Sequence, residues 1–257
     1  MPELPDVEGF RRVLATHAVG RRIKHVDVLD DGVLRNVNAR TLEAKLRGRS
    51  FEQPRRHGKW LITPVRHAGV MMLHFGMTGM LCWVEPRQDR HRDDRVVFAF
   101  DDGELRYRDL RKLRGLWLTD DENEVLADVG PDAAEISADE LRDLLAKRHR
   151  QVKAALIDQS VVAGIGNLLA DEILWRARVH PRLPCHRLAR GDFGRLDRAR
   201  RSVLRQSIAK GRVPPHKSWL TGRRDDPSGS CPRCGTTLAH DRIGGRSTTW
   251  CPHCQPS

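Results

Sequence analysis

Four cysteines near the end of the chain limit most strongly what this sequence can fold into. Cys231-Pro-Arg-Cys234 and Cys251-Pro-His-Cys254 are two Cys-x-x-Cys pairs separated by sixteen residues. Two residues between thiolates let both sulfurs reach the same tetrahedral metal, and two such pairs complete a closed four-sulfur zinc site. The pattern predicts one structural zinc ion that folds a small β-hairpin. A closed site has no open position, so we expect the metal to take no part in chemistry.

The charge balance favours a polyanionic partner. The 257 residues include 46 Lys and Arg against 34 Asp and Glu, a formal net charge of +12. A surplus of this size favours nucleic acid over a membrane surface, although a merely soluble basic protein is the plain alternative. No stretch approaches the roughly 20 apolar residues of a membrane span, and the N-terminus lacks the basic start and apolar run of a signal peptide. We therefore expect a cytoplasmic, DNA-associated protein without a membrane anchor.

Hydrophobic patterning predicts several domains. Residues 6–17 have helical spacing, and residues 22–118 contain short apolar runs at 59–64, 70–73, 96–100 and 116–118, with a hairpin turn at 101–103. This texture is typical of an antiparallel sandwich or barrel. Helical patterns follow at 138–147, 152–158, 168–178 and 195–210. We expect a multidomain α+β protein with a β domain (1–120), a linker (121–135), a helical domain (136–225) and a zinc finger (226–257).

The chain opens Met1-Pro2-Glu3-Leu4-Pro5-Asp6-Val7-Glu8. Methionine is normally removed before a small second residue, and removal would make Pro2 the N-terminus. A terminal proline is a secondary amine that can attack an aldehyde-like carbon and form an iminium. An α-amino group has a reference pKa of about 7.7–8.0, so about a tenth is unprotonated at neutral pH. A stiff, unreactive start is the alternative, and the nearby carboxylates favour the reactive interpretation.

A second motif, Gly164-Ile-Gly166-Asn167, stands between two helical segments. Glycines permit a tight turn there, and a helix that begins after them points free backbone N–H groups outward. These groups suit a phosphate, to which the Asn167 amide can also donate. The alternative is a simple turn between helices.

Taken together, these motifs resemble the formamidopyrimidine-DNA glycosylase/endonuclease VIII family of base-excision repair enzymes. The resemblance covers essentially the whole chain, in one order. It is carried by Pro2-Glu3-Leu4-Pro5 with Val7-Glu8, Gly58-Lys59, His74-Phe-Gly76-Met77-Thr-Gly79, Asp109-Leu-Arg111-Lys112, Gly164-Ile-Gly166-Asn167, and Arg246 with the four cysteines.

The resemblance implies a fold and a partner. The family has an N-terminal β-sandwich flanked by helices, a helix–two-turn–helix domain and a four-cysteine zinc finger. Double-stranded DNA with an oxidised base or an abasic site lies in a basic cleft, and the damaged nucleotide is flipped into a pocket. The resemblance also implies a monomer, with no organic cofactor.

The resemblance assigns chemistry to four residues. Pro2 would attack C1′ of the deoxyribose to form a Schiff base, while Glu3 would act as general acid/base at the sugar. Lys59 matches a hairpin lysine that assists base release and elimination. Arg246 matches a finger arginine that grips phosphate and supports the second elimination, and Asn167 would clamp the same phosphate region.

Further DNA contacts are implied for His74, Lys153 and His91. The basic contact near 91–95 stays open among His91, Arg92 and Arg95.

Three more residues match those that fill the gap left by the flipped nucleotide. They are Met77, Arg111 and Leu113; Met can act as a wedge, and Arg can bond the orphaned base. For Met77 the alternative is a core strand residue. Leu113 stands where the glycosylase branch generally has an aromatic wedge, so we expect weaker stacking there.

The chain departs from the family pattern elsewhere too. Asp6 replaces the usual glutamate, and the span between Lys210 and Cys231 is shorter than in enzymes that close a loop over 8-oxoguanine. We hypothesise an open pocket that prefers ring-opened purines or oxidised pyrimidines. A non-catalytic DNA binder of the same fold is the first alternative, and a zinc-ribbon protein of transcription or translation is the second.

Overall fold

The computed structural model describes residues 1–86, 88–226 and 228–257. Within them the chain forms two units. The first contains residues 1–2 and 6–128, and the second contains Glu3–Pro5 and Val129–Ser257. Arg87 and Pro227 lie outside the described residues, and Pro227 falls in the short span on which the open-pocket hypothesis depends. Each unit is considered separately below.

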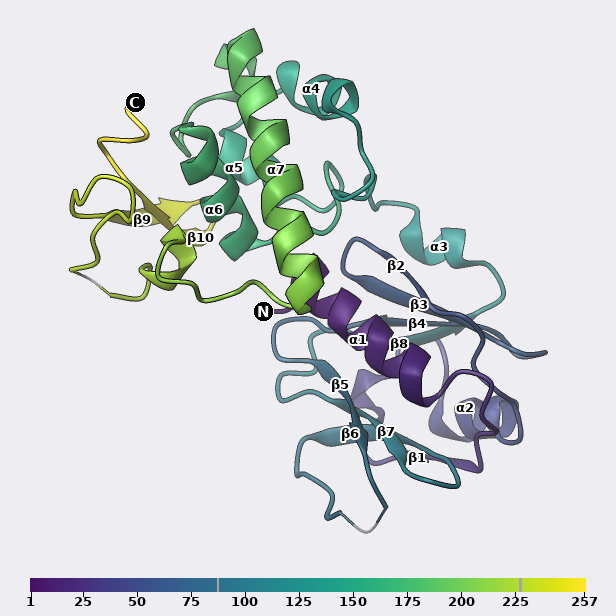
Figure 1. Cartoon of the computed structure of the whole chain (residues 1–257). Coiled ribbons are helices and arrows are strands. Elements are labelled where there is room, and N and C mark those ends of the chain that lie inside the picture. The colour runs from purple at the N-terminus through teal and green to yellow at the C-terminus, as the bar shows by residue number, and fades with distance from the viewer. Residues whose placement is uncertain (87, 227) are drawn as a thin grey trace. The chain divides into compact units, whose positions relative to one another are not determined.

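The first unit is built on two four-stranded antiparallel sheets (Figure 1). One sheet has the order β1-β6-β7-β5 and the other has the order β2-β3-β4-β8. The strands are β1 (His25–Val28), β2 (Arg55–His57), β3 (Trp60–Val65), β4 (Gly69–His74), β5 (Met80–Val84), β6 (Asp94–Ala99), β7 (Glu104–Arg108) and β8 (Gly115–Thr119). The predicted hairpin turn at 101–103 joins β6 to β7, where the Phe100 N–H donates to the Gly103 carbonyl at 2.9 Å.

Helices flank this sandwich. Helix α1 (Leu4–His17) contributes Val7 and Leu14 to the core of the first unit, and α2 (Ala39–Leu46) contributes Leu42 and Leu46. These side chains pack with residues of both sheets, including Phe51, Leu73, Phe98 and Tyr107. Sequence patterning did not predict α2, which begins where the Asn38 side chain accepts a hydrogen bond from the Thr41 N–H at 2.8 Å. A short helix, α3 (Glu122–Leu126), occupies part of the segment expected to be a linker.

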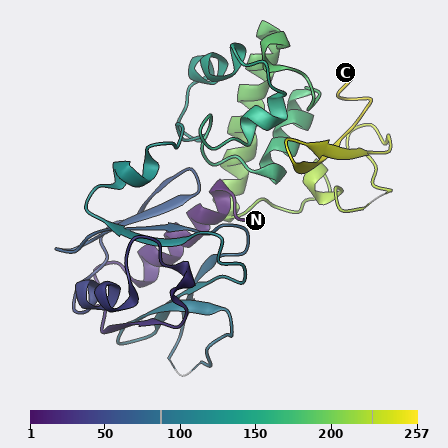
Figure 2. The same ribbon diagram turned by 180° about the vertical axis from the view of Figure 1, so that it is seen from behind.

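The second unit contains four helices and a β-hairpin among its described residues. They are α4 (Ala138–Ala146), α5 (Val152–Leu156), α6 (Asn167–Ala177), α7 (Arg190–Lys210), β9 (Ala239–Ile243) and β10 (Arg246–Trp250). Helix α7 begins five residues earlier than the pattern predicted, because the Asp192 carboxylate accepts from the Ala189 N–H at 2.7 Å and so starts the helix. Figure 2 shows the yellow hairpin beside α6, which it contacts through β10.

The core of the second unit is aliphatic. Residues of α4, α5, α6 and α7 form one buried cluster, which includes Leu141, Leu156, Ile173 and Val203, together with Leu4 from the start of α1. The predicted fold class is confirmed in both units: an antiparallel sandwich flanked by helices, then a helical region and a cysteine-bearing hairpin.

Candidate active site

Glu3 is held at the start of α6. Its side chain is buried, and its two carboxylate oxygens accept hydrogen bonds from three backbone N–H groups: Gly166 at 3.0 Å, Leu168 at 2.8 Å and Leu169 at 3.1 Å. The first N–H groups of a helix have no partner inside the helix and carry its positive dipole end. A carboxylate that accepts three of them satisfies these donors and is itself stabilised as an anion. Glu3 therefore caps α6, a role that sequence reasoning missed.

The two glycines of the motif make room for this cap. A Cβ added to Gly166 would lie 2.2 Å from the Glu3 carboxyl carbon, and Gly164 has a φ of +106°. The Gln159 side chain braces the turn, accepting from the Gly164 N–H at 3.0 Å and donating to the Ile165 carbonyl at 2.9 Å. The Gly-x-Gly spacing is thus required by the close approach of Glu3 as well as by the turn.

Asn167 and Arg246 meet at the finger strand. The Asn167 amide donates to the Ser247 carbonyl at 2.8 Å, which ties the first residue of α6 to β10. Arg246 is the first residue of β10 and is exposed, directly after the Gly244-Gly245 turn, whose φ angles are +58° and +74°. The predicted phosphate-gripping pair therefore comes from adjacent positions of the second unit.

Lys153 lies in the same region but is buried. Its ammonium is 2.6 Å from an Asp171 carboxylate oxygen and donates to the Ser247 carbonyl at 2.9 Å and to Thr248 Oγ1 at 2.7 Å. Burial lowers the pKa of Lys153 and raises that of Asp171, while their mutual attraction opposes both shifts. With no side-chain exposure, Lys153 binds the protein's own groups here. Its predicted role as a DNA contact stays a prediction.

The four cysteines form a metal site of the right size. Their sulfur atoms all lie within 4.8 Å of one another, with Cys234–Cys251 at 3.5 Å and Cys231–Cys254 at 3.9 Å. A tetrahedral zinc with bonds of about 2.3 Å requires sulfurs roughly 3.8 Å apart, so the cluster fits zinc. Trp175 of α6 donates its indole N–H to Cys231 Sγ at 3.4 Å, which joins the finger to the helix.

Lys59 belongs to a tight turn of the first unit. It is buried and follows Gly58 (φ +56°) between β2 and β3, the hairpin in which the motif placed it. The Arg56 guanidinium closes the turn, donating to the Gly58 carbonyl at 3.1 Å. Glu8 of α1 lies 3.9 Å from Arg56; burial raises its pKa, but Arg11, Arg12 and Arg56 outweigh burial and the net pKa is lowered.

His74 is a neutral histidine at the end of β4. Burial lowers its pKa to about 3, and the charges of Arg114 and Lys59 act in the same direction. Its Nδ1 accepts from the Gly76 N–H at 3.1 Å, which leaves the ring proton on Nε2. His74 can therefore donate one hydrogen bond to a phosphate but brings no positive charge to it.

Two loops of the first unit bring the three predicted gap-filling residues together. Met77 lies between β4 and β5, outside the strands, and its sulfur is 3.0 Å from Arg111 Nη1. Buried Asp109 joins the loops, accepting from Thr78 Oγ1 at 2.6 Å and from the Arg111 N–H at 3.1 Å. Leu113 is half exposed, and a Cβ on Gly76 would lie 3.5 Å from Leu113 Cβ.

The structure separates the three candidates near 91–95. The Arg95 guanidinium is engaged, donating to the Asp109 carbonyl at 2.8 Å and to Asp93 at 3.1 Å. His91 Nδ1 accepts from the Asp93 N–H at 3.1 Å, and its side chain is about half exposed. Arg92 is the most exposed of the three, at 86%. Arg95 is thus a brace for the loop of Arg111, and His91 and Arg92 are accessible.

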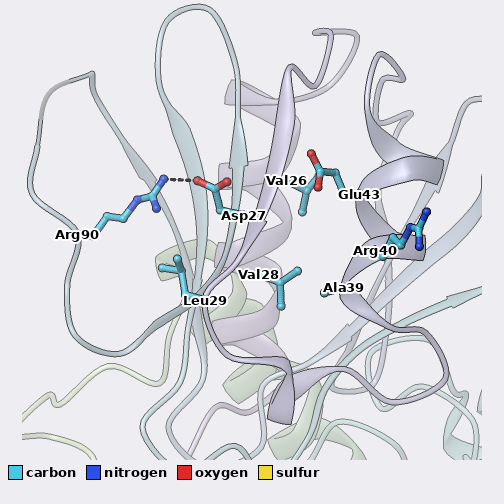
Figure 3. A pocket seen from close by; sticks show the side chains of 8 residues that line it. All are labelled: Val26, Asp27, Val28, Leu29, Ala39, Arg40, Glu43 and Arg90. Carbon is cyan, nitrogen blue, oxygen red and sulfur yellow. Dashed lines mark hydrogen bonds and ion pairs between the residues drawn. The ribbon is translucent and has the colours of Figure 1, made fainter.

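A hollow elsewhere in the first unit has none of these residues. It has a volume of about 350 Å³ between β1 and α2 and is lined by Val26, Asp27, Val28, Leu29, Ala39, Arg40, Glu43 and Arg90 (Figure 3). Arg90 and Asp27 form an ion pair across its mouth. The predicted chemistry does not belong to this hollow.

An antiparallel sandwich, helices that frame a glycine turn and a cysteine-bound hairpin are together the architecture of the helix–two-turn–helix DNA glycosylases. Family models match the chain in the same order: the formamidopyrimidine-DNA glycosylase N-terminal domain over residues 1–116, its H2TH domain over 128–215, and the zinc finger found in FPG and IleRS over 230–256. The chain belongs to the formamidopyrimidine-DNA glycosylase family.

Full-length relatives support this membership. The chain is 36% identical to the formamidopyrimidine-DNA glycosylase of Symbiobacterium thermophilum, covering 100% of the chain and 90% of the relative. It is 34% identical to that of Synechococcus sp., covering 100% and 99%. The structure matches Lactococcus lactis Fpg in complex with DNA that contains an abasic site, with a TM-score of 0.88, 27% identity and full coverage of both chains. A complex of the same enzyme with FAPY-dG-containing DNA gives 0.89 and 26%, covering 99% and 100%.

The comparisons confirm the predicted family, the DNA glycosylase class and the structural zinc site, for which the finger model and the cysteine geometry agree. In the described residues, no helix is both long and apolar enough to cross a membrane.

Proposed function

We propose that the chain is a bifunctional DNA glycosylase and abasic-site lyase that uses the amino nitrogen of Pro2 as its nucleophile. The observation that carries the proposal is the anchoring of Glu3. The residue that directly follows Pro2 is fixed by three N–H groups at the Gly-x-Gly-Asn turn. Such anchoring is what a nucleophile at a chain terminus requires, because a free terminus is otherwise among the most mobile parts of a protein.

The proposed reaction proceeds through one covalent intermediate. The Pro2 nitrogen attacks C1′, the bond between C1′ and the base breaks, and the sugar ring opens to give an iminium. The iminium acidifies the C2′ proton, whose loss expels the 3′ phosphate; a second elimination expels the 5′ phosphate, and water releases the enzyme. Neither elimination needs a metal. The zinc, when bound, folds the hairpin that presents Arg246.

The other residues act on phosphates and the empty base position. Asn167 and Arg246 are placed to hold the phosphate beside the lesion, and Lys59 is placed to assist proton transfer. Met77, Arg111 and Leu113 would fill the gap in the duplex. Support for DNA as the substrate comes from the solved Lactococcus lactis complexes and from the net charge of +12.

We further propose that the lesion pocket is open. The span from Lys210 to Cys231 is short, and two of its residues, Trp219 and Leu220, are buried within the second unit, which leaves little chain for a cover. Formamidopyrimidines and oxidised pyrimidines are then preferred over 8-oxoguanine. A Lactococcus lactis complex with DNA that contains an oxidised pyrimidine is consistent with this range (TM-score 0.89, 27% identity).

Borohydride trapping on abasic-site duplex tests the enzymatic proposal. We expect wild-type protein, with removal of Met1 verified by mass spectrometry, to give a covalent protein–DNA adduct, and Pro2→Gly to lose most of it. A wild-type protein that binds the duplex without trapping would leave the alternative, a DNA binder of the same fold. Excision from duplexes with each of the three lesions ranks them, and fast removal of 8-oxoguanine would reject the open pocket.

A further inference from the structure

Ser247, the residue after Arg246, is held by side chains from three separate segments of the second unit. Lys153 of α5 donates to its carbonyl at 2.9 Å and Asn167 of α6 at 2.8 Å. Arg224, from the segment after α7, donates to its hydroxyl at 3.2 Å and lies 3.4 Å from the carbonyl. A single residue of the finger is thus fixed by contacts to α5, α6 and the segment that precedes the first cysteine pair.

Asp171 organises two of these three donors. One of its carboxylate oxygens is 2.6 Å from the Lys153 ammonium, and the other is 3.3 Å from Arg224 Nη1 and accepts from the Thr249 N–H at 3.3 Å. Asp171 lies one helical turn after Asn167, so both residues share the face of α6 that contacts β10. The side chains of Lys153, Asp171 and Arg224 are 0%, 1% and 7% exposed.

This cluster is electrostatically constrained. Two buried cations share one carboxylate, and an unpaired buried charge is far more costly than a paired one. Without Asp171, Lys153 and Arg224 would repel each other, and both would lose the group that directs them to Ser247. Packing restricts the cluster further, because the Gly244 position touches Ala154, the neighbour of Lys153 in α5, at 3.2 Å from an added Cβ.

We infer that Asp171 is a positioning residue for the phosphate clamp: through Lys153 and Arg224 it fixes Ser247, and so sets the backbone of Arg246 on one side and the amide of Asn167 on the other. The inference rests on the proposed function, because the clamp is the proposed site of the phosphate beside the lesion. It also assigns Arg224, a residue outside every motif of the sequence, to the same device.

Asp171→Asn is the central variant, and Glu172→Gln is its matched control. Glu172 is the next residue of α6 and is equally buried, but it pairs with Arg176 at 2.8 Å and accepts from the Thr221 N–H, away from Ser247. Both variants remove one buried carboxylate from the same helix. A purely structural role for Asp171 therefore predicts equal effects of the two variants at equal loss of thermal stability.

The primary measurement is the affinity for a duplex with a tetrahydrofuran abasic analogue, which requires no chemistry. We expect Asp171→Asn to weaken binding about tenfold and Glu172→Gln to stay within about twofold of wild type, because small displacements of a clamp are costly. In an Arg246→Ala background, Asp171→Asn should add little further loss. Equal effects of the two carboxylate variants, or full additivity with Arg246→Ala, would overturn the inference.

A second variant covers loss of folding. If Asp171→Asn loses zinc or its helical circular dichroism, Arg224→Gln is used in its place, since it removes one hold on Ser247 and leaves the Lys153–Asp171 pair intact. We expect a smaller loss of affinity that is again absent in the Arg246→Ala background, and a wild-type affinity would overturn the inference. If wild-type protein binds the analogue but cannot be trapped on abasic DNA, the proposed chemistry fails while this comparison still decides the positioning role.

Discussion

Replacing Glu3 with Gln should destabilise the second unit as well as impair chemistry. The glutamine side chain keeps one acceptor oxygen, but its NH2 group takes the place of the other. Oε2 accepts from the N–H groups of Gly166 and Leu169. If the NH2 group stands there, two donors lose their acceptor and face another donor, so Glu3→Gln is not a neutral probe of acid–base chemistry.

The size of the effect follows from these contacts. Hydrogen bonds to a charged group contribute about 1.5–3 kcal/mol each, so the loss of two lowers the free energy of unfolding by about 3 kcal/mol or more. Removing the negative charge from the helix N-terminus adds up to about 1 kcal/mol. For a unit of this size, a loss of 3 kcal/mol lowers the melting temperature by roughly 10 °C.

Differential scanning calorimetry of the full chain measures this shift. Glu140→Gln is the control, because Glu140 also accepts a backbone N–H, that of Ser137 at 2.7 Å, in the exposed capping box of α4, and we expect little change there. A Glu3→Gln protein that melts within about 2 °C of wild type, yet loses activity, would refute the cap and leave Glu3 a purely chemical role.

Three further predictions address the rest of the site. Chelation of the zinc, or Cys251→Ser, should abolish hydrogen-exchange protection of β9 and β10 while α7 stays protected, and unchanged protection would contradict a structural metal. Because the pKa of His74 is lowered to about 3 from the reference of 6.5, its contribution to stability is complete above pH 6.5 and is lost as the pH falls toward 3. Between pH 7 and 5 the loss is about 2 kcal/mol, which His74→Asn should remove from urea unfolding curves; an NMR titration midpoint near 6.5 would contradict it. Leu113→Phe should strengthen binding of the tetrahydrofuran duplex several-fold by stacking, and an unchanged or weaker affinity would argue against a wedge at this position.

Local patterns were sufficient to predict most elements. The Cys-x-x-Cys pairs defined the metal site, and apolar runs located β3, β4, β6 and β8 to within two residues because each strand contributes to a buried face. Helix α2 was not predicted, since its signal is an Asn38 cap and two buried leucines within a region that otherwise has strand texture.

The missed features depend on contacts between residues far apart in the sequence. Glu3 meets the start of α6 more than 160 residues later, and nothing near Glu3 in the sequence indicates that its partner is a helix N-terminus. Likewise, Lys153, Asp171 and Arg224 become one cluster only when α5, α6 and the finger pack together. A glycine at 166 was an indirect signal, because a position that excludes a Cβ implies the close approach of another group.

The most direct test of the central claim is to locate the covalent bond. Wild-type protein is reduced with borohydride on abasic-site DNA and digested with nuclease and protease, and the N-terminal peptide is sequenced by tandem mass spectrometry. The account predicts a deoxyribose-derived mass on the nitrogen of Pro2, with Met1 absent. An adduct on Lys59 or another lysine, or a reactive protein that retains Met1, would contradict it.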